Sequence, residues 1–502
     1  MAVFLAIFYF LARLINLTKL PIFNDEAIYL DWGWRATNLP GQLFVSLYDA
    51  KQPLLVWIFG LFENILKNPL FAGRLVSIMT GFLTLLGIYF LAKSVFDKKV
   101  AFLAGIFYIA IPIFSFFDRQ ALMESSLVAV NVWSFYLFSK LKKTEKYLYA
   151  FLLGVLLGLG FFIKTTGLFF ILSTFILNGI WFAKARSEKG KEILKRLVLV
   201  FYTVQFVLLP LYLQKVFWLT VHTNDRYALS IYEIIDLPLG HWLENLKQTA
   251  GIIFWYFTPG VSLLAILGLL LAFRKKGKDL IFWFFIQLFL FLITVRHSSP
   301  RYVVPFLPSF TILAAFSVSR LWRFKKPAAA TLLGASLAFT SLLTYFQIVV
   351  PLDYFNILAN LSPYSQKKAY VTGWPSGYGV PEVWGFLEKK GKEKPILVGV
   401  RLDFGNPENA IFTYFHKKNQ VNVVYFDGRL MPDILEKNDC LVSETPFYFV
   451  SRDNQLSNLN KFLKEEQKFY KPEKKSFIGI YSLKDQCQGK TIELAQLVKR
   501  KR

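Results

Sequence analysis

The chain is poor in charged residues, in cysteine and in histidine. Only 18% of its 502 residues are charged, two are cysteine and four are histidine. Soluble domains usually carry about 25% charged residues, so this composition falls outside that class. It also excludes a disordered chain, a disulfide framework and a structural zinc site built from Cys and His.

Apolar and basic side chains are in excess instead. Hydrophobic residues make up 55% of the chain, 53 residues are Phe, and the mean hydropathy is +0.42. The formal net charge is +25. A surplus of this size is typical of nucleic-acid binding, or of a membrane protein with basic cytoplasmic loops. The positions of the charges decide between these two classes.

Long apolar segments fill the first 350 residues. A bilayer core of about 30 Å needs roughly 20 apolar residues per helix. We therefore expect a polytopic α-helical membrane protein, with a transmembrane domain over 1–350. Its eleven expected spans are 2–17, 70–92, 99–116, 125–139, 147–163, 166–183, 197–213, 251–273, 279–295, 303–319 and 328–350. The apolar stretch 53–66 is too short for a span and is expected to lie in the outer interface.

The connections between these spans alternate in charge. The basic ones, at 93–99, 140–146, 184–196, 274–278 and 320–326, hold 21 Lys or Arg in 39 residues, whereas the opposite ones hold 11 in 105. The positive-inside rule makes the basic set cytoplasmic. In a plasma membrane the N-terminus is then cytoplasmic, 18–69 is the first exterior loop and 351–502 lies outside or in the periplasm. The basic surplus is thus a topology signal, and nucleic acid is not an expected partner.

Residues 351–502 are expected to form a small α/β domain. Strands are predicted at 395–400, 421–427, 447–451 and 477–483, and helices at 382–390 and 456–469. Both cysteines, Cys440 and Cys487, fall in this domain. They either form a disulfide or remain two thiols, and the sequence leaves both alternatives open.

The first exterior loop carries an acidic motif. Asp25 and Glu26 follow the first span, where a carboxylate could accept the proton of an attacking hydroxyl or amine. The alternative is a helix N-terminus, in which Asn24 or Asp25 begins a helix running through Trp34. Glu26 would then be favourable in the first turn.

A second acidic loop, 117–124, opens on the same face of the membrane. One alternative to a functional role is that Asp118 and Arg119 pair with each other. Glu124, at the mouth of the fourth span, has no such sequence neighbour and is the stronger functional candidate. Arg13, near the outer end of the first span, is expected to snorkel to the interface.

Four cations lie on this less basic face: Lys51, Lys164, Arg296 and Arg301. Grouped cations suit a phosphate, which Arg can bind through two hydrogen bonds. The alternative is that each anchors to lipid head groups. His297 either tunes a phosphate site or is structural.

The order of these motifs resembles a known family. The residues that carry the resemblance are Asp25-Glu26-x-x-Tyr29, Lys51-Gln52-Pro53-Leu54, Arg119-x-x-x-x-Glu124, Gly158 to Lys164, and Arg301-Tyr302-x-x-Pro305-x-x-Pro308. They are similar to the C-type (GT-C) integral-membrane glycosyltransferases related to the dolichyl-phosphate-mannose protein mannosyltransferases and the bacterial aminoarabinose transferase. The resemblance implies a GT-C fold. It also implies that a sugar is transferred from a polyprenyl-phosphate donor to a protein, lipid or glycan acceptor on the exterior face.

The resemblance also implies roles for single residues. Asp25 matches the general base and Glu26 its supporting partner. Lys51 matches the lysine that meets the carrier phosphate, and Glu124 a second catalytic acid. Donor-phosphate contacts are further expected from Lys164, Arg296 and Arg301, with Tyr29, Asp118, His297 and Tyr302 as supporting residues.

No cofactor is required if these cations stabilise the leaving phosphate, although the paired carboxylates could also bind Mg²⁺ or Mn²⁺. Two alternatives belong to other classes, namely a transporter or flippase of lipid-linked sugars and a non-catalytic membrane scaffold. A transporter predicts internal repeats and charges near the bilayer midplane. The sequence shows no clear repeat.

Overall fold

The computed structural model describes residues 2–183, 187–220, 226–273, 277–401, 405–426, 439–456, 459–484 and 490–494. The chain forms two compact units. Unit 1 comprises Met1–Leu17, Ala36–Ile58 and Arg74–Tyr364. Unit 2 comprises Thr18–Arg35, Phe59–Gly73 and Ser365–Arg502, so it contains the first acidic motif together with the C-terminal region.

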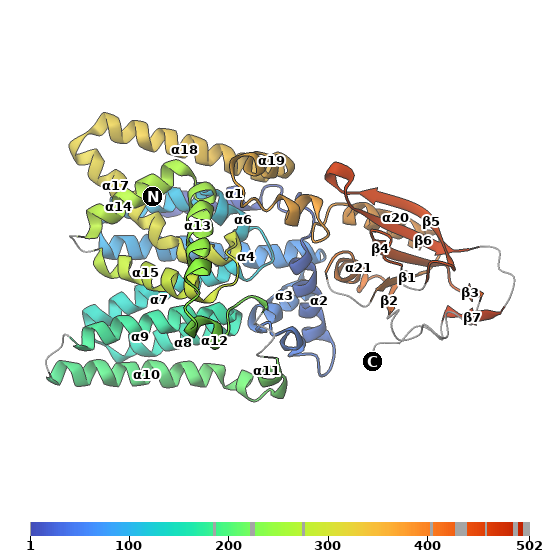
Figure 1. The fold of residues 1–502 in the computed structure, drawn as a ribbon, viewed down its shortest axis with the longest axis horizontal. Coiled ribbons are helices and arrows are strands. Elements are labelled where there is room, and N and C mark those ends of the chain that lie inside the picture. The colour runs from blue at the N-terminus through green and yellow to red at the C-terminus, as the bar shows by residue number, and fades with distance from the viewer. Residues whose placement is uncertain are drawn as a thin grey trace. The chain divides into compact units, whose positions relative to one another are not determined.

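Unit 1 is built from helices. The long ones are α1 (Ala2–Leu14), α4 (Pro69–Val95), α5 (Lys98–Ala110), α7 (Glu124–Thr144), α8 (Tyr147–Ile163), α9 (Leu168–Ala183), α10 (Ser187–Tyr212), α13 (Leu239–Tyr256), α14 (Pro259–Phe273), α15 (Lys278–Thr294), α17 (Pro308–Phe324) and α18 (Lys326–Val349). Shorter helices are α3 (Leu54–Ile65), α6 (Pro112–Asp118), α11 (Lys215–Leu219), α12 (Ile231–Ile235), α16 (Pro300–Val303) and α19 (Pro351–Leu361). Only residues 54–58 of α3 and 74–95 of α4 belong to this unit, and the rest of both helices belongs to unit 2. Tight 3₁₀ turns are η1 (Val45–Asp49), η2 (Thr165–Gly167) and η4 (Val304–Phe306). Figure 1 shows α7, α8, α9 and α10 running side by side, with α8 packed against both α7 and α10.

Small residues set the close packing of α8 on α10. A Cβ added to Gly154 would lie 2.9 Å from the carbonyl oxygen of Val200, and one added to Gly158 would lie 2.7 Å from the Cβ of Val207. Glycines at this spacing let two apolar helices approach without a driving force from water.

Several of these helices are long and apolar enough to cross a membrane. Among the described residues, four single helices meet this condition, and up to seven spans result if each bent pair counts as one. Every expected span coincides with a helix or a bent pair of helices. The number of crossings stays a prediction.

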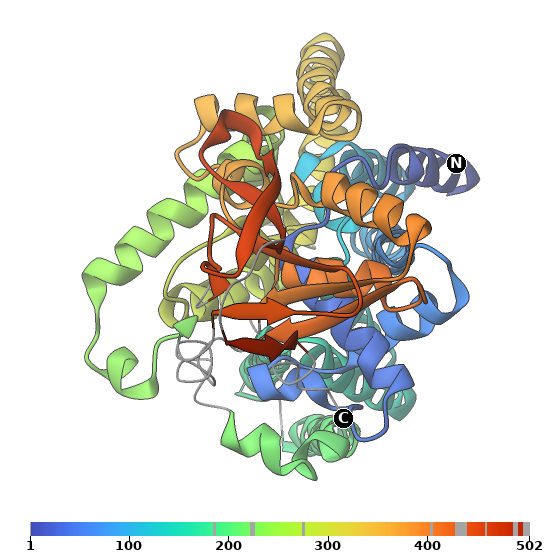
Figure 2. The ribbon, with the colours of Figure 1, turned by 90° about the vertical axis from the view of Figure 1, so that its right-hand side faces the viewer.

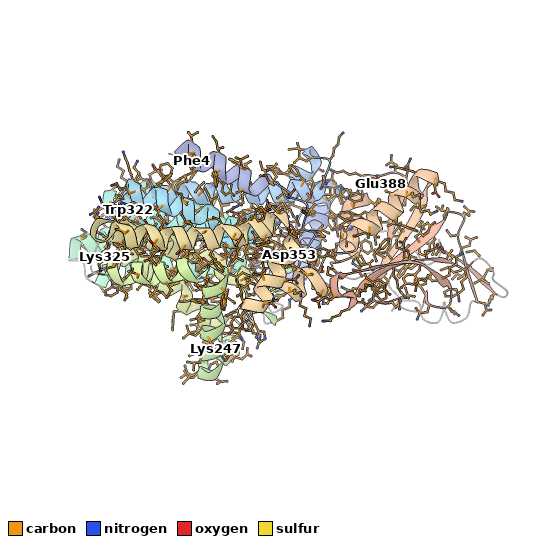
Figure 3. The ribbon with its side chains drawn as sticks, turned by 90° about the horizontal axis from the view of Figure 1, so that it is seen from above. Phe4, Lys247, Trp322, Lys325, Asp353 and Glu388 are labelled. Atoms are coloured by element: carbon orange, nitrogen blue, oxygen red, sulfur yellow. The ribbon has the colours of Figure 1, made fainter. Side chains whose placement is uncertain are left out.

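Three expected spans, 99–116, 251–273 and 303–319, are bent pairs rather than continuous helices, and the sharpest bend lies in 251–273. The chain turns by 115° between α13 and α14. Thr258 has a positive φ of 71°, and Pro259 begins α14 because it has no N–H to donate to a preceding turn. Figures 1 and 3 show α13, which carries Lys247, extending crosswise to the other helices of unit 1.

Unit 2 contains α2 (Asn24–Asn38, of which the residues through Arg35 belong to this unit) and a five-stranded sheet. The sheet order is β2-β1-β4-β6-β5, formed by β1 (Ile396–Arg401), β2 (Val421–Phe426), β4 (Phe447–Arg452), β5 (Leu463–Tyr470) and β6 (Phe477–Leu483). β1 pairs in parallel with β2 and β4, and β6 pairs antiparallel with β4 and β5. Helices α20 (Val380–Glu393) and α21 (Glu408–Phe415) accompany the sheet, and β3 (Cys440–Val442) pairs with β7 (Thr491–Glu493). A small C-terminal domain with the four predicted strands is therefore confirmed, whereas its expected bounds, 351–502, stay a prediction.

The expected helix at 456–469 is wrong. Residues 463–470 form β5, which Figures 1 and 2 show paired with β6 at one edge of the sheet. The sequence LKEEQKFY is rich in residues that favour helices, but pairing with β6 overrides this local preference. Its exposed Glu465 and Glu466 are typical of an edge strand that resists further pairing.

Candidate active site

A buried carboxylate in unit 1 joins two of the predicted phosphate-binding cations. Glu124 begins α7 and is 0% exposed. Its Oε1 accepts hydrogen bonds from Lys164 Nζ at 2.7 Å and from Arg301 Nε at 3.1 Å. The two cationic side chains remain 18% and 16% exposed. A buried carboxylate requires opposite charges around it. Glu124 therefore holds two cations together while each keeps some surface for an anionic ligand.

The position of Lys164 depends on a tight turn between α8 and η2. A Cβ added to Gly167 would lie 2.5 Å from the carbonyl oxygen of Gly160, so only glycine permits this approach. The turn places Lys164 Nζ 5.0 Å from the centre of the Tyr302 ring, within the range of a cation–π contact. Tyr302 thus lies in the same cluster, and its supporting role stays a prediction.

A second group of charges surrounds Tyr227. Lys51 Nζ lies 4.4 Å from the centre of the Tyr227 ring. The backbone N–H of Arg296 donates to the Tyr227 carbonyl oxygen at 3.0 Å. The neighbouring Arg226 forms an ion pair with Asp49. This group brings Lys51 and Arg296 together, although they are distant in sequence.

Asp49 holds Arg226 as a charged member of this second group. Burial lowers the pKa of Arg226, but the hydrogen bond that Arg226 donates to Asp49 and the charge of that carboxylate outweigh it and raise this pKa.

Arg296 and His297, which the sequence predicted near the donor phosphate, are placed less favourably for binding it. Arg296 Nη2 forms an ion pair with Glu233 Oε2 at 2.9 Å. Hydrogen bonds from the Ser230 backbone and from Arg296 hold the pKa of Glu233 down at about 2, so this carboxylate stays ionised beside Arg296. His297 is exposed on the same connection.

Sequence reasoning missed Arg226 and Tyr227. Neither belongs to a motif, and both lie in the long connection 214–250. The sequence nevertheless carried a signal for Arg226, because the connection 214–250 belongs to the less basic set and holds only three Lys or Arg.

Asp118 and Arg119 do not pair with each other, so that expectation is wrong. Asp118 Oδ2 accepts a hydrogen bond from Arg13 Nε at 3.1 Å, and Asp118 also accepts from Tyr108 and Ser125. Arg119 donates to carbonyl oxygens at the end of α1. Arg13 is 0% exposed, so its expected snorkelling is wrong as well. The buried pair locks α1 to α6, because neither ion can be left alone in an apolar interior.

In unit 2 the acidic motif begins α2, which confirms the helix N-terminus interpretation. Glu26 is 0% exposed and its Oε2 accepts the Phe23 backbone N–H at 2.9 Å. Asn24 Nδ2 donates to Asp25 Oδ1 at 3.1 Å. Tyr29 is buried in the same helix. Glu26 therefore serves the helix end, and the half-buried Asp25 is the carboxylate better suited to chemistry.

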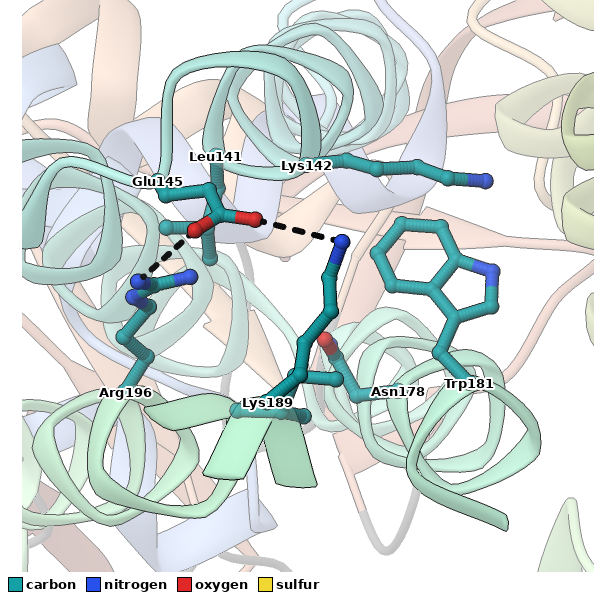
Figure 4. Close-up of a pocket in the computed structure, with 8 residues that line it drawn as sticks. Leu141, Lys142, Glu145, Asn178, Trp181, Lys189 and Arg196 are labelled. Atoms are coloured by element: carbon teal, nitrogen blue, oxygen red, sulfur yellow. Dashed lines mark hydrogen bonds and ion pairs between the residues drawn. The ribbon is translucent and has the colours of Figure 1, made fainter. Parts of the chain in front are cut away.

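A cavity of about 320 Å³ lies elsewhere in unit 1, among α7, α9 and α10. Figure 4 shows Glu145 between Lys189 and Arg196, at distances of 3.6 and 3.4 Å. Lys142 lies over the Trp181 ring. The cavity contains none of the predicted site residues, and its cations belong to the basic connections. It is a cluster of ion pairs at helix ends.

The described residues test the predicted metal site and the cysteine pairing only in part. Within it, no three His, Cys, Asp or Glu side chains are grouped so that they could hold a metal ion. Cys440 is buried in β3, whereas Cys487 lies outside the described residues, so their pairing stays a prediction.

Comparison with known proteins defines the class of fold. The chain resembles ArnT from Cupriavidus metallidurans bound to undecaprenyl phosphate, with a TM-score of 0.59 and 13% identity over 95% of this chain and 96% of that chain. It resembles the apo state of ArnT with a TM-score of 0.56 and 15% identity, over 95% and 97%. For the Archaeoglobus fulgidus oligosaccharyltransferase tethered with an acceptor peptide, the TM-score is 0.50 and the identity 14%, over 94% and 73%. The chain therefore has the GT-C fold of integral-membrane glycosyltransferases.

A sequence comparison matches part of the chain to the model of one family. Residues 50–212 match the family described as dolichyl-phosphate-mannose-protein mannosyltransferase. No curated protein sequence matches the chain. Together with the ArnT-like fold, the match confirms the resemblance predicted from the motifs, to the family of protein mannosyltransferases and the aminoarabinose transferase.

Proposed function

We propose that the protein transfers a sugar from a polyprenyl-phosphate donor to an acceptor on the exterior face of the membrane. The observation that carries this proposal is the cluster in which buried Glu124 holds Lys164 and Arg301. Cations that are fixed in place and partly exposed suit a lipid-linked phosphate. The likeness to ArnT, whose structure is bound to undecaprenyl phosphate, supports the same class of donor.

The proposed reaction is a single displacement. The acceptor oxygen or nitrogen attacks the anomeric carbon, its proton passes to Asp25, and the bond from that carbon to the phosphate oxygen breaks. The configuration at the anomeric carbon is inverted, and lipid phosphate leaves with the bonding electrons. Lys51, Lys164 and Arg301 stabilise the negative charge that develops on the leaving phosphate. Arg226 joins this set through its place over the Tyr227 ring, which Lys51 also contacts.

The geometry changes the role proposed for Glu124. Its Oε1 already accepts from two cations, and it has 0% exposure. A carboxylate in this state is a poor proton acceptor and a good anchor. We therefore assign it to holding Lys164 and Arg301 in position, and leave Asp25 as the proposed base.

The topology proposed with this function follows from the charge pattern. The protein is a multi-pass plasma-membrane protein whose N-terminus is cytoplasmic, and its C-terminal region lies on the exterior or periplasmic side. The donor phosphate and the acceptor, whether protein, lipid or glycan, then meet on that side.

The test uses the full chain reconstituted in lipid nanodiscs with radiolabelled polyprenyl-phosphate sugars and cell-envelope fractions as acceptors. We expect donor consumption and labelled product, which are lost in Asp25→Asn and in Arg301→Gln. Lys247→Ala is the matched control, because the side chain of this cation on α13 is 74% exposed and pairs with Glu244 rather than with a predicted site residue. Full activity of Asp25→Asn would refute the proposed base, and failure to consume any donor of this class would refute the function.

A further inference from the structure

Within unit 2, the C-terminal region contacts the segment that leads into the acidic motif. The Asn406 side chain donates to the carbonyl oxygens of Ile22 and Pro375, both at 3.0 Å. The backbone N–H of Asn24 donates to the same Pro375 oxygen at 3.0 Å. The start of α2 is therefore held by residues from two parts of the C-terminal region.

The Asn24 side chain connects these contacts to Asp25. Its Oδ1 accepts the backbone N–H of Asn406 at 3.0 Å, and its Nδ2 donates to Asp25 Oδ1 at 3.1 Å. An amide turned by 180° would set its amino group against the Asn406 N–H and its oxygen against the carboxylate. Both arrangements are repulsive. The backbone at residue 406 thus determines which end of the amide faces Asp25.

The close approach at this point requires glycine. Gly405 has a φ of +101°, a conformation that other residues rarely adopt. A Cβ added to Gly405 would lie 1.5 Å from Asn24 Oδ1. Any larger residue at 405 must displace the Asn24 amide.

A second contact holds α2 further along the helix. Asp31 is 0% exposed and accepts from Arg35 Nε and Nη2, both at 2.7 Å, and from Asn409 Nδ2. Arg35 also donates to the Tyr425 hydroxyl at 3.0 Å. Because α2 is held at two separate points, it cannot rotate about either one alone.

We propose that the C-terminal region is a positioning element for Asp25, acting through the Asn406 backbone and the Asn24 amide. The proposal rests on the proposed function, since it matters only if Asp25 accepts the proton. A donor on one carboxylate oxygen stabilises the ionised form and fixes the plane of the carboxylate. Asn24 and Gly405 are thus positioning residues, and the C-terminal region is part of the catalytic apparatus.

Two variants test this inference. Asn24→Asp keeps the shape and the bond from residue 406, but presents an oxygen to Asp25 instead of an N–H. We expect kcat to fall about 10- to 100-fold, because a small misplacement of a reacting group has effects of this size. The acidic limb of the kcat–pH profile should move to higher pH, since a like charge disfavours the ionised carboxylate. The KM for the donor should not change.

Gly405→Ala displaces the Asn24 amide by a direct clash and should lower kcat without changing the KM for the donor. Gly385→Ala is its matched control, because a Cβ added there meets nothing within 4 Å. Asn422→Ala, on the exposed side of β2, is the control for loss of an amide. Both controls should keep the kcat of the wild type.

The outcomes separate this inference from the proposed function. If Asp25→Asn is inactive while Asn24→Asp and Gly405→Ala keep the wild-type kcat and pH profile, the positioning role is overturned and the function stands. If Asp25→Asn is active, the proposed base itself fails. Binding of the labelled donor reports whether Gly405→Ala is folded, and if it is not, the pH profile of Asn24→Asp decides.

Discussion

Replacing Glu124 by glutamine tests whether a buried carboxylate organises the phosphate site. Glu124→Gln keeps the size of the side chain but removes the charge shared by Lys164 and Arg301. Hydrogen bonds to charged groups contribute about 1.5–3 kcal/mol each. In this variant the amide oxygen still accepts one of these two hydrogen bonds, but more weakly. The side chains of Lys164 and Arg301 can turn toward solvent, because they are already 18% and 16% exposed. We therefore expect the free energy of unfolding to fall by about 2–3 kcal/mol.

The matched control is Glu145→Gln. Glu145 also contacts two cations, Lys189 at 3.6 Å and Arg196 at 3.4 Å, but its side chain is 46% exposed. Exposed pairs contribute about 0–1 kcal/mol, so this variant should lose at most that amount. Denaturant unfolding of the purified protein, followed by tryptophan fluorescence, measures both losses.

Glu124→Gln also distinguishes between two roles of Glu124, namely positioning the cations and acting as a catalytic acid. If Glu124 only positions the two cations, Glu124→Gln should lower kcat about 100-fold, because the cations are misplaced, and should keep the acidic limb of the kcat–pH profile. If Glu124 is instead a catalytic acid or base, the variant should lose that limb. Equal losses of stability in Glu124→Gln and Glu145→Gln would refute the reasoning from burial, and loss of the acidic limb would restore the catalytic role implied by the resemblance.

Three further predictions follow from other parts of the chain. Arg13→Gln leaves Asp118 buried without its cation, so the free energy of unfolding should fall by about 3–5 kcal/mol, and an unchanged denaturation midpoint would contradict this. Burial and the charge of Lys417 lower the pKa of His416 to about 4, below its value of about 6.5 in the unfolded chain. The contribution of neutral His416 to stability is therefore complete above pH 6.5 and is lost as the pH falls toward 4. His416→Gln should flatten this loss in thermal unfolding measured between pH 4 and 8. For the proposed topology, a membrane-impermeant maleimide applied to intact cells should label Lys247→Cys and spare Lys142→Cys in a background without Cys440 and Cys487, whereas equal labelling would contradict it.

Local sequence signals determined most of the secondary structure. Apolar runs of about 20 residues coincide with helices because burial of a whole helix surface requires such a run. The four predicted strands are confirmed for the same kind of reason, since their β-branched and aromatic residues fit a half-buried sheet. The start of α2 at Asn24 followed from short-range capping chemistry, which depends only on neighbours in the chain.

Tertiary structure decided what local signals could not. Residues 463–470 have helix-forming composition, and they form a strand because β6 offers its unpaired backbone groups. The bend at Thr258 and Pro259 divides a stretch that hydropathy treats as one span, because hydropathy does not detect a change of backbone direction.

In the candidate site, too, some features follow from the sequence and others only from the tertiary structure. The sequence by itself determined which residue types are present in the less basic connections, and motif order predicted Asp25, Lys51 and Arg301 as site residues. Only the fold decided that Glu124 meets Lys164 and Arg301, which are 40 and 177 residues away, and that Asp118 meets Arg13. An ion pair that is distant in sequence leaves no local pattern, because its two members satisfy each other's charge only after the helices that carry them have packed together.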